Sequence, residues 1–198
     1  KILELLSITP ANSKSIREIS KETKLSYNTT YKIITSLEND HHLHLQKMST
    51  HVNCTLNNTP STLLALSYIN SIATSNFLDQ NQIIKKIHLE LISNSQIQLC
   101  LLFGSYAKGT ARKDSDIDLL VITNEKKQIS LLASELSLKF NKKIDLHIYT
   151  PNEFEYELHE KTQTVAKQAL NTAIVLKGYE YYWQYAIIYK NQNSENLQ

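Results

Sequence analysis

The chain has 198 residues, of which 41% are hydrophobic, enough for a packed core in one large domain or two small ones. No stretch approaches the roughly 20 consecutive apolar residues of a membrane helix, and the first residues lack the apolar run of a secretory signal, so we expect a cytoplasmic protein with no membrane segment. The formal net charge of +2 gives little support to nucleic-acid binding by the protein as a whole, although residues 1–57 hold 7 basic and 5 acidic side chains. The only two cysteines, Cys54 and Cys100, lie in apolar strand-like runs and are predicted to be buried thiols.

The first 57 residues predict three helices followed by a β-hairpin. Apolar residues have helical spacing over 1–7, Ser15 opens a capping-box sequence before a second helix, and Ser26 is a suitable N-cap for a third. Apolar and polar residues then alternate over 43–45 and 52–56, on either side of a predicted turn. We expect the third helix to bury one face, made of Thr30, Ile33, Ile34 and Leu37.

Residues 15–57 resemble the winged helix domains of prokaryotic transcription regulators, most clearly in Ile16-Arg17-Glu18-Ile19-Ser20 and in Leu25-Ser26-Tyr27-Asn28-Thr29-Thr30-Tyr31-Lys32-Ile33-Ile34. In such domains the second helix of the pair enters the major groove of DNA. The resemblance departs at Lys24 in the tight turn and at His42 before the wing, where Gly is usual, so these two residues are expected to take positive φ at a cost of about 1 to 2 kcal/mol each. Winged helices also serve dimerisation and protein docking, so a homodimer or a docked partner stays open beside DNA. The residues expected to contact DNA are Tyr27, Asn28, Thr29, Tyr31, Lys32 and Thr35.

A strand, a glycine turn and a pair of aspartates mark the middle of the chain. The buried-strand run of residues 97–103 ends at Gly104-Ser105, and Ser115-Asp116-Ile117-Asp118-Leu119 opens a second apolar run. Side chains on a strand alternate faces, so Asp116 and Asp118 point the same way, with Cα atoms roughly 6.5 to 7 Å apart. The two carboxylates are therefore placed to share metal ions.

Two hard cations held by carboxylates suit an in-line displacement at phosphorus, because they stabilise both the attacking and the leaving oxygens. Mg²⁺ prefers oxygen ligands, including those of a substrate phosphate. We expect Gly104 to let the backbone approach a triphosphate, and Ser105 to open a helix whose N–H groups hold phosphate oxygens. The predicted ligand is a nucleoside triphosphate with two Mg²⁺ ions, with Mn²⁺ as an alternative.

A third carboxylate is expected from a neighbouring strand. An amphipathic helix is predicted over 129–140, and Lys143-Ile144-Asp145-Leu146-His147-Ile148-Tyr149 alternates like a strand. Inward packing of Ile144, Leu146 and Ile148 would put Asp145 and His147 on the site-facing side. We interpret His147 as a residue beside the site rather than a catalyst, because Asp145 already supplies the base or metal ligand.

Residues 104–120 with Asp145 resemble the nucleotidyltransferase superfamily that includes DNA polymerase beta, and look most like its small prokaryotic members, the minimal nucleotidyltransferases. The resemblance implies a small mixed sheet flanked by helices and Mg²⁺-dependent transfer of a nucleoside monophosphate, most simply from ATP, to a hydroxyl. It further implies that Asp116, Asp118 and Asp145 are the catalytic metal ligands, and that Gly104, Ser105 and Ser115 bind the nucleotide.

The acceptor is not evident from these residues. Some small members of this family modify antibiotics, and others are antitoxins that modify a Tyr of a helical partner toxin of the HEPN type; the attached winged helix favours the second kind by analogy. The alternative is a DNA-binding regulator whose transferase-like domain only senses nucleotide or docks a partner.

The chain is divided accordingly into an α/β (α+β) arrangement of two modules. We expect a winged helix-turn-helix domain at 1–58, connecting helices at 59–95, the nucleotidyltransferase domain at 96–190 and a disordered polar tail at 191–198. The Tyr-rich stretch after Gly178 is interpreted as a packed helix whose buried face holds Tyr181, Tyr185 and Ile188.

Overall fold

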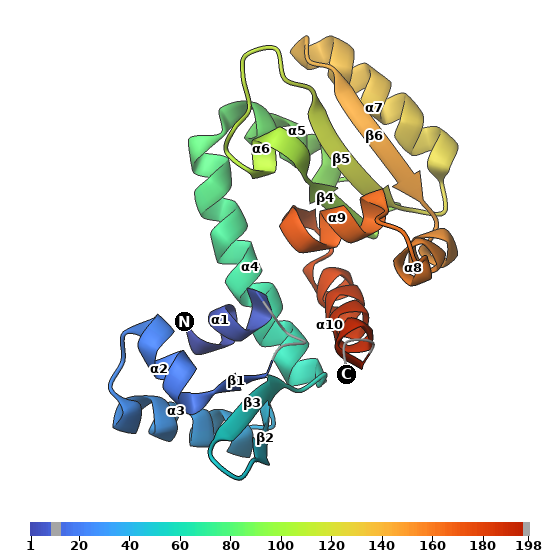
Figure 1. The fold of residues 1–198 in the computed structure, drawn as a ribbon. Coiled ribbons are helices and arrows are strands. Elements are labelled where there is room, and N and C mark those ends of the chain that lie inside the picture. The colour runs from blue at the N-terminus through green and yellow to red at the C-terminus, as the bar shows by residue number, and fades with distance from the viewer. Residues whose placement is uncertain (9–12, 196–198) are drawn as a thin grey trace. The chain divides into compact units, whose positions relative to one another are not determined.

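The computed structural model describes residues 1–8 and 13–195 (Figure 1). The chain divides into two compact units, one of Lys1–Ile69 with the end of the chain from Ala186, the other of Asn70–Tyr185. Within the described residues, no helix is both long enough and apolar enough to cross a bilayer.

The first unit contains a pair of short helices and a three-stranded antiparallel sheet (Figure 1). Both helices of the pair begin at the predicted caps: the Ser15 hydroxyl accepts a hydrogen bond from the N–H of Glu18, and the Ser26 hydroxyl accepts one from Thr29. The strand order in the sheet is β1-β3-β2. The elements are α1 (Ile2–Ile8), β1 (Lys14–Ser15), α2 (Ile16–Thr23), α3 (Tyr27–Asn39), β2 (Leu43–Lys47) and β3 (Val52–Leu56).

Two predictions for α3 need correction. Thr30 and Ile34 are buried, but Ile33 is 37% exposed, because it lies about 100° around the helix from Ile34 and falls outside the contact. Lys24 does adopt positive φ (56°), yet the second positive-φ residue is His41 (60°) rather than His42. His41 directly follows the C-cap Asp40, and this is the position where helices commonly end in the left-handed conformation.

The second unit is built on a four-stranded mixed sheet with the order β6-β5-β4-β7. Strand β5 is parallel to β6 and antiparallel to β4, which is antiparallel to β7. The parallel pair needs a crossover connection, and α7 provides it, packing against β6. The small mixed sheet flanked by helices was predicted. Two helices have residues in both units, α4 (Pro60–Gln80) and α10 (Tyr179–Glu195). The other elements of the second unit are α5 (Gln82–Ile92), β4 (Leu99–Leu102), α6 (Gly104–Ala107), β5 (Ile117–Ile122), α7 (Lys126–Phe140), β6 (Ile144–Tyr149), α8 (Pro151–His159), α9 (Val165–Thr172) and β7 (Ile174–Lys177).

The core of this unit holds the central strands rigidly. Every residue of β5 except Asp118 is buried, and β4 is buried throughout. Ile144, Leu146 and Ile148 pack against this core, as predicted. Since strand residues alternate, Asp145 and His147 occupy the opposite face of β6.

The C-terminal helix differs from its prediction in two ways. Helix α10 continues through residues 191–195 of the expected polar tail, while residues 196–198 lie outside the described residues. Its buried face holds Tyr182 and Trp183, whereas Tyr181 is 45% exposed; the side chain of Ile188 is not among those described. The Tyr182 hydroxyl donates to the carbonyl of Leu170 at 2.9 Å, which turns Tyr182 rather than Tyr181 inward.

Both cysteines are free and fully buried, as predicted. Burial raises the pKa of the Cys54 thiol to about 11 and that of Cys100 to about 12. Both side chains are therefore protonated at neutral pH.

Candidate active site

The predicted carboxylates meet where β5 and β6 begin. Asp118 and Asp145 are direct partners in the parallel ladder. Partners in register project from the same face of a sheet, and neighbouring strands lie about 4.8 Å apart. Asp116 directly precedes β5, two residues before Asp118, so the alternation of the strand places it on the same face.

The end of β4 reaches the same edge of the sheet, because β4 runs antiparallel to β5. The Phe103 N–H donates to the Asp118 carbonyl at 3.0 Å, which brings the next residue, Gly104, against the Asp118 side chain. Gly104 has φ of 66°, and a Cβ there would lie 1.8 Å from Oδ2 of Asp118. Glycine is thus required both by the backbone conformation and by the carboxylate beside it.

The backbone N–H of Ser105 lies close enough to the Asp118 carboxylate to lower the pKa of that group. The predicted role of the N–H groups after Gly104, which is to hold phosphate oxygens, stays a prediction. The helix there, α6, has only 4 residues.

The three aspartates share one electrostatic environment. The pKa of Asp118 is raised mainly by burial, and further by the charges of Asp145 and Asp116. The Ser105 N–H and the nearby His147 act in the opposite direction and lower it. Ionisation of Asp118 is therefore unfavourable in this environment, and a cation at the site would relieve that cost.

Two basic side chains border the carboxylates. The Lys143 ammonium donates to Oδ2 of Asp116, and this hydrogen bond raises the pKa of Lys143. His147 Nε2 lies 3.9 Å from Oδ2 of Asp145, and its ring packs against Phe103 with 5.6 Å between centroids. His147 thus stands beside the site, where the sequence analysis placed it.

The part of the chain that the structure describes contains no group of three His, Cys, Asp or Glu side chains gathered closely enough to ligate one metal ion. Among the aspartates, Asp116 accepts a hydrogen bond from Lys143. The donor set nevertheless suits a hard cation: three carboxylates project from one edge of the sheet, and Gly104 leaves the space in which one of them lies.

Ser115, predicted to bind nucleotide, closes the loop that precedes Asp116. Its hydroxyl accepts from the Arg112 N–H at 2.8 Å, and its own N–H donates to the Arg112 carbonyl at 3.1 Å. These bonds shape the loop that leads into β5.

Two features of the site were not predicted. One is the contact between Gly104 and Asp118, which depends on the register of β4 against β5. The other is Lys143, although a signal was present: Lys143 and Asp145 have the same two-residue spacing as Asp116 and Asp118. When Asp118 lies opposite Asp145 on paired parallel strands, the equal spacing also sets Asp116 beside Lys143.

The residues expected to contact DNA lie on the first turns of α3. Tyr27 and Tyr31 are 48% and 50% exposed, and their rings stack with 6.4 Å between centroids. Asn28, Thr29 and Lys32 are exposed as well, while Thr35 is half-buried.

Two crystal structures resemble part of the chain. A toxin–antitoxin complex with AMP-PNP contains a chain that is 22% identical, with a TM-score of 0.41, over 56% of this chain and 89% of that one. A double Asp→Glu mutant of the toxin–antitoxin pair MntA–HpeT contains one that is 24% identical, also with a TM-score of 0.41, over 58% of this chain and 88% of that one.

Sequence comparison is more specific. Residues 85–177 match the family model described as polymerase beta, nucleotidyltransferase. The proposed protein adenylyltransferase MJ0141 of Methanocaldococcus jannaschii is 34% identical over 76 residues, which cover 34% of this chain and 77% of that protein. The chain therefore belongs to the polymerase beta type of nucleotidyltransferases, and it is a nucleotidyltransferase enzyme.

Proposed function

We propose that this enzyme transfers a nucleoside monophosphate from a nucleoside triphosphate, ATP in the first place, to a hydroxyl group of a partner protein, with release of pyrophosphate. The observation that carries the proposal is the pairing of Asp118 with Asp145 across parallel strands, with Asp116 on the same face. The choice of ATP and of a protein acceptor is supported by the name of the M. jannaschii relative.

The three aspartates are proposed to hold two Mg²⁺ ions, with Mn²⁺ able to replace them. Bound divalent cations would neutralise the charge that develops on the phosphoryl oxygens. Three residues are proposed to bind or position the triphosphate. Gly104 would let the backbone approach it closely because it has no side chain. Ser105 would act beside Asp118, and Ser115 would fix the loop before Asp116.

Asp145 is proposed to receive the proton of the acceptor hydroxyl. Its side chain is 53% exposed, against 38% for Asp116, so an incoming acceptor can reach it. The Nε2 atom of His147 lies 3.9 Å from Oδ2 of Asp145, so its ring borders the proposed base.

The test is transfer of label from each α-³²P-labelled nucleoside triphosphate to proteins that co-purify with the chain, followed by mass spectrometry of the labelled residue. Asp118→Asn keeps the shape of the side chain and should abolish transfer. A second substitution, Asp114→Asn, removes the same charge from the exposed loop before the site and serves as the control. Equal transfer by both variants would remove Asp118 from the reaction.

A helical partner toxin of the HEPN type is our proposed acceptor, and a Tyr hydroxyl the proposed group. The attached N-terminal unit supports a regulatory setting of this kind by analogy only. Mass spectrometry that finds the label on a small molecule instead of a protein would contradict this part of the proposal.

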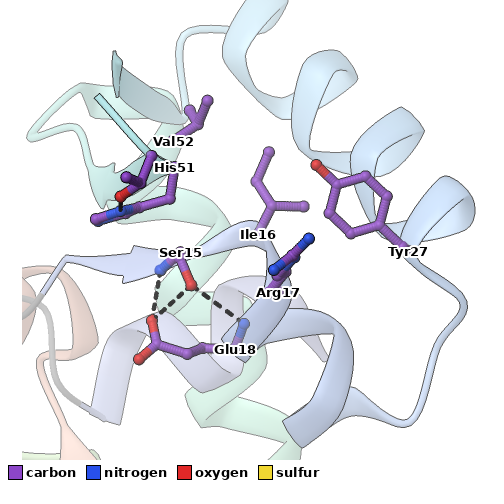
Figure 2. Close-up of a pocket in the computed structure, with 8 residues that line it drawn as sticks. Ser15, Ile16, Arg17, Glu18, Tyr27, His51 and Val52 are labelled. Carbon is purple, nitrogen blue, oxygen red and sulfur yellow. Dashed lines mark hydrogen bonds between the residues drawn. The ribbon is translucent and has the colours of Figure 1, made fainter. Parts of the chain in front are cut away.

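We also propose that residues 1–58 form a winged helix-turn-helix that binds DNA. The order of α2, α3 and the β2–β3 hairpin supports this, with β2–β3 as the wing. A pocket of about 470 Å³ is lined by residues from the starts of both helices and from the hairpin turn. Among these residues are Arg17, Tyr27 and His51, whose side chains are drawn in Figure 2. These are hydrogen-bond donors suited to phosphate oxygens.

The DNA proposal is tested by gel retardation of upstream DNA across a series of salt concentrations. Replacing Lys32 with Ala should reduce the salt dependence of binding by about one counterion. Lys86→Ala removes the same charge from α5, outside this unit, and should leave the slope unchanged. Absence of any retardation at low salt would leave dimerisation or docking as the role of the unit.

A further inference from the structure

The register that pairs the two catalytic aspartates also pairs a lysine with the third. Ile117 is the partner of Ile144, and the Ile117 N–H donates to the Lys143 carbonyl at 2.9 Å. One step toward the start of each strand, Asp116 therefore lies beside Lys143. Both residues stand two positions before the Asp118–Asp145 pair, so their side chains share its face.

The side chains of Asp116 and Lys143 are also in contact. The Lys143 ammonium hydrogen-bonds Oδ2 of Asp116 at the rim of the site, where the two side chains are 72% and 38% exposed. The neighbouring Lys142 points elsewhere: its ammonium donates to the Lys113 carbonyl and lies 5.9 Å from the centroid of the Tyr106 ring. The two adjacent lysines thus have the same charge but contact different groups.

A lysine ammonium and a divalent cation compete for the same carboxylate oxygen. Both are cations that seek anionic oxygen, and the lone pairs of Oδ2 that point to Lys143 are not free for a metal. The face carries three carboxylates and one ammonium, so Lys143 partly neutralises the trio when no metal is bound.

We infer that Lys143 is a positioning residue, an internal counter-cation that holds Asp116 in the metal-free enzyme and must release it when a divalent cation binds. This inference rests on the proposed function of Asp116 as a metal ligand. It predicts that the native enzyme binds metal less tightly than the carboxylates alone would allow.

The competition is modest in size. An exposed ion pair changes an equilibrium constant by at most about fivefold. Removing the ammonium should therefore tighten metal binding by roughly two- to fivefold beyond the general effect of losing one positive charge.

The experiment is a titration of the full chain with Mn²⁺ alone, without nucleotide, in which free Mn²⁺ is followed by electron paramagnetic resonance. Lys143→Met should bind Mn²⁺ about two- to fivefold more tightly than the matched control Lys142→Met, which loses the same charge one residue away. Lys143→Arg should restore native affinity, because the guanidinium can pair with Asp116 in the same way.

Equal affinity of Lys143→Met and Lys142→Met, or weaker binding by Lys143→Met, would overturn the inference. Asp116→Asn separates this failure from failure of the proposed function. If Asp116→Asn weakens Mn²⁺ binding and removes the difference between the two lysine variants, both proposals stand. If Asp116→Asn leaves Mn²⁺ binding unchanged, Asp116 is not a metal ligand, and the proposed site itself is wrong along with the competition.

Discussion

Gly104 offers the sharpest test of how the site is built. Replacing it with Ala adds a Cβ at a backbone φ of 66°, with Oδ2 of Asp118 at 1.8 Å and Cγ at 2.6 Å. Gly109 is a matched control, because it has nearly the same φ, 69°, and no atom within 4 Å of an added Cβ. Both substitutions meet the same backbone penalty, and only one meets the carboxylate.

The magnitudes separate stability from activity. Left-handed backbone costs an Ala roughly 1–2 kcal/mol, so Gly109→Ala should lose about that much free energy of unfolding. In Gly104→Ala the carboxylate can rotate away from the new methyl group, at the cost of its bond with the Ser105 N–H, while the Asp118 Cβ at 3.1 Å stays close. We expect a further loss of about 1–2 kcal/mol.

Activity should fall much further than stability. A displacement of about 1 Å in a group that positions reactants costs on the order of 100-fold in rate. Gly104→Ala should therefore lose at least about 100-fold in nucleotidyl transfer, whereas Gly109→Ala keeps transfer within a few-fold of native.

Urea denaturation and label transfer measure the two effects on the same preparations. In an Asp118→Ala background the clash with the carboxylate is gone and only the 3.1 Å approach to the Asp118 Cβ remains, so the extra stability cost of Gly104→Ala over Gly109→Ala should largely disappear, a coupling that a double-mutant cycle reports directly. If Gly104→Ala matched Gly109→Ala in stability and also retained transfer, the close approach of Gly104 to the Asp118 carboxylate would not exist in solution.

Three further predictions concern other groups. Asp145→Ala should keep Mg²⁺–triphosphate binding within several-fold but lose at least about 100-fold in transfer, since the contact of Asp145 with the acceptor is needed chiefly in the transition state. Calorimetry measures the binding and the label-transfer assay measures the reaction. Full transfer by the variant would show that Asp145 is not the third carboxylate of the site. The hydrogen bond from Lys126 holds the pKa of Glu153 at about 2, below its usual 4.5. The ionised carboxylate therefore stabilises the fold fully above pH 4.5 and loses that effect as the pH falls toward 2. The melting temperature of Glu153→Gln should be lower than that of the native protein above pH 4.5 and equal to it near pH 2. Cys54 and Cys100 should resist an aromatic disulfide reagent at pH 8 until urea unfolds the chain, and rapid reaction of the native protein would contradict their burial.

Local signals in the sequence predicted much of this fold. The capping-box sequence at Ser15 and the cap at Ser26 located two helix starts, and the two-residue periods around Asp118 and Asp145 located β5 and β6. These signals depend on a few neighbouring residues and on backbone chemistry that holds in any context. Predictions were least secure where a choice between adjacent residues depended on packing.

Adjacent-residue choices account for the corrections. His41 instead of His42 takes the left-handed conformation because the helix ends at Asp40, and the end of a helix varies by a residue or two from any sequence-based estimate. Tyr182 instead of Tyr181 is buried because its hydroxyl finds the Leu170 carbonyl, 12 residues away. Neither the exact end of the helix nor the contact with Leu170 follows from the local spacing of apolar residues.

The site itself shows the same division between local pattern and tertiary register. Spacing alone places Asp116 and Asp118 on one face of a strand, but a slip of one residue between β5 and β6 would turn Asp145 away from them. The observed register sets Asp118 against Asp145 and, by the same step, Asp116 against Lys143. Any shift that separated the lysine from Asp116 would also separate Asp118 from Asp145. The ammonium and the carboxylate pair are thus coupled by the backbone, and a sequence scan for acidic residues alone finds only half of the arrangement.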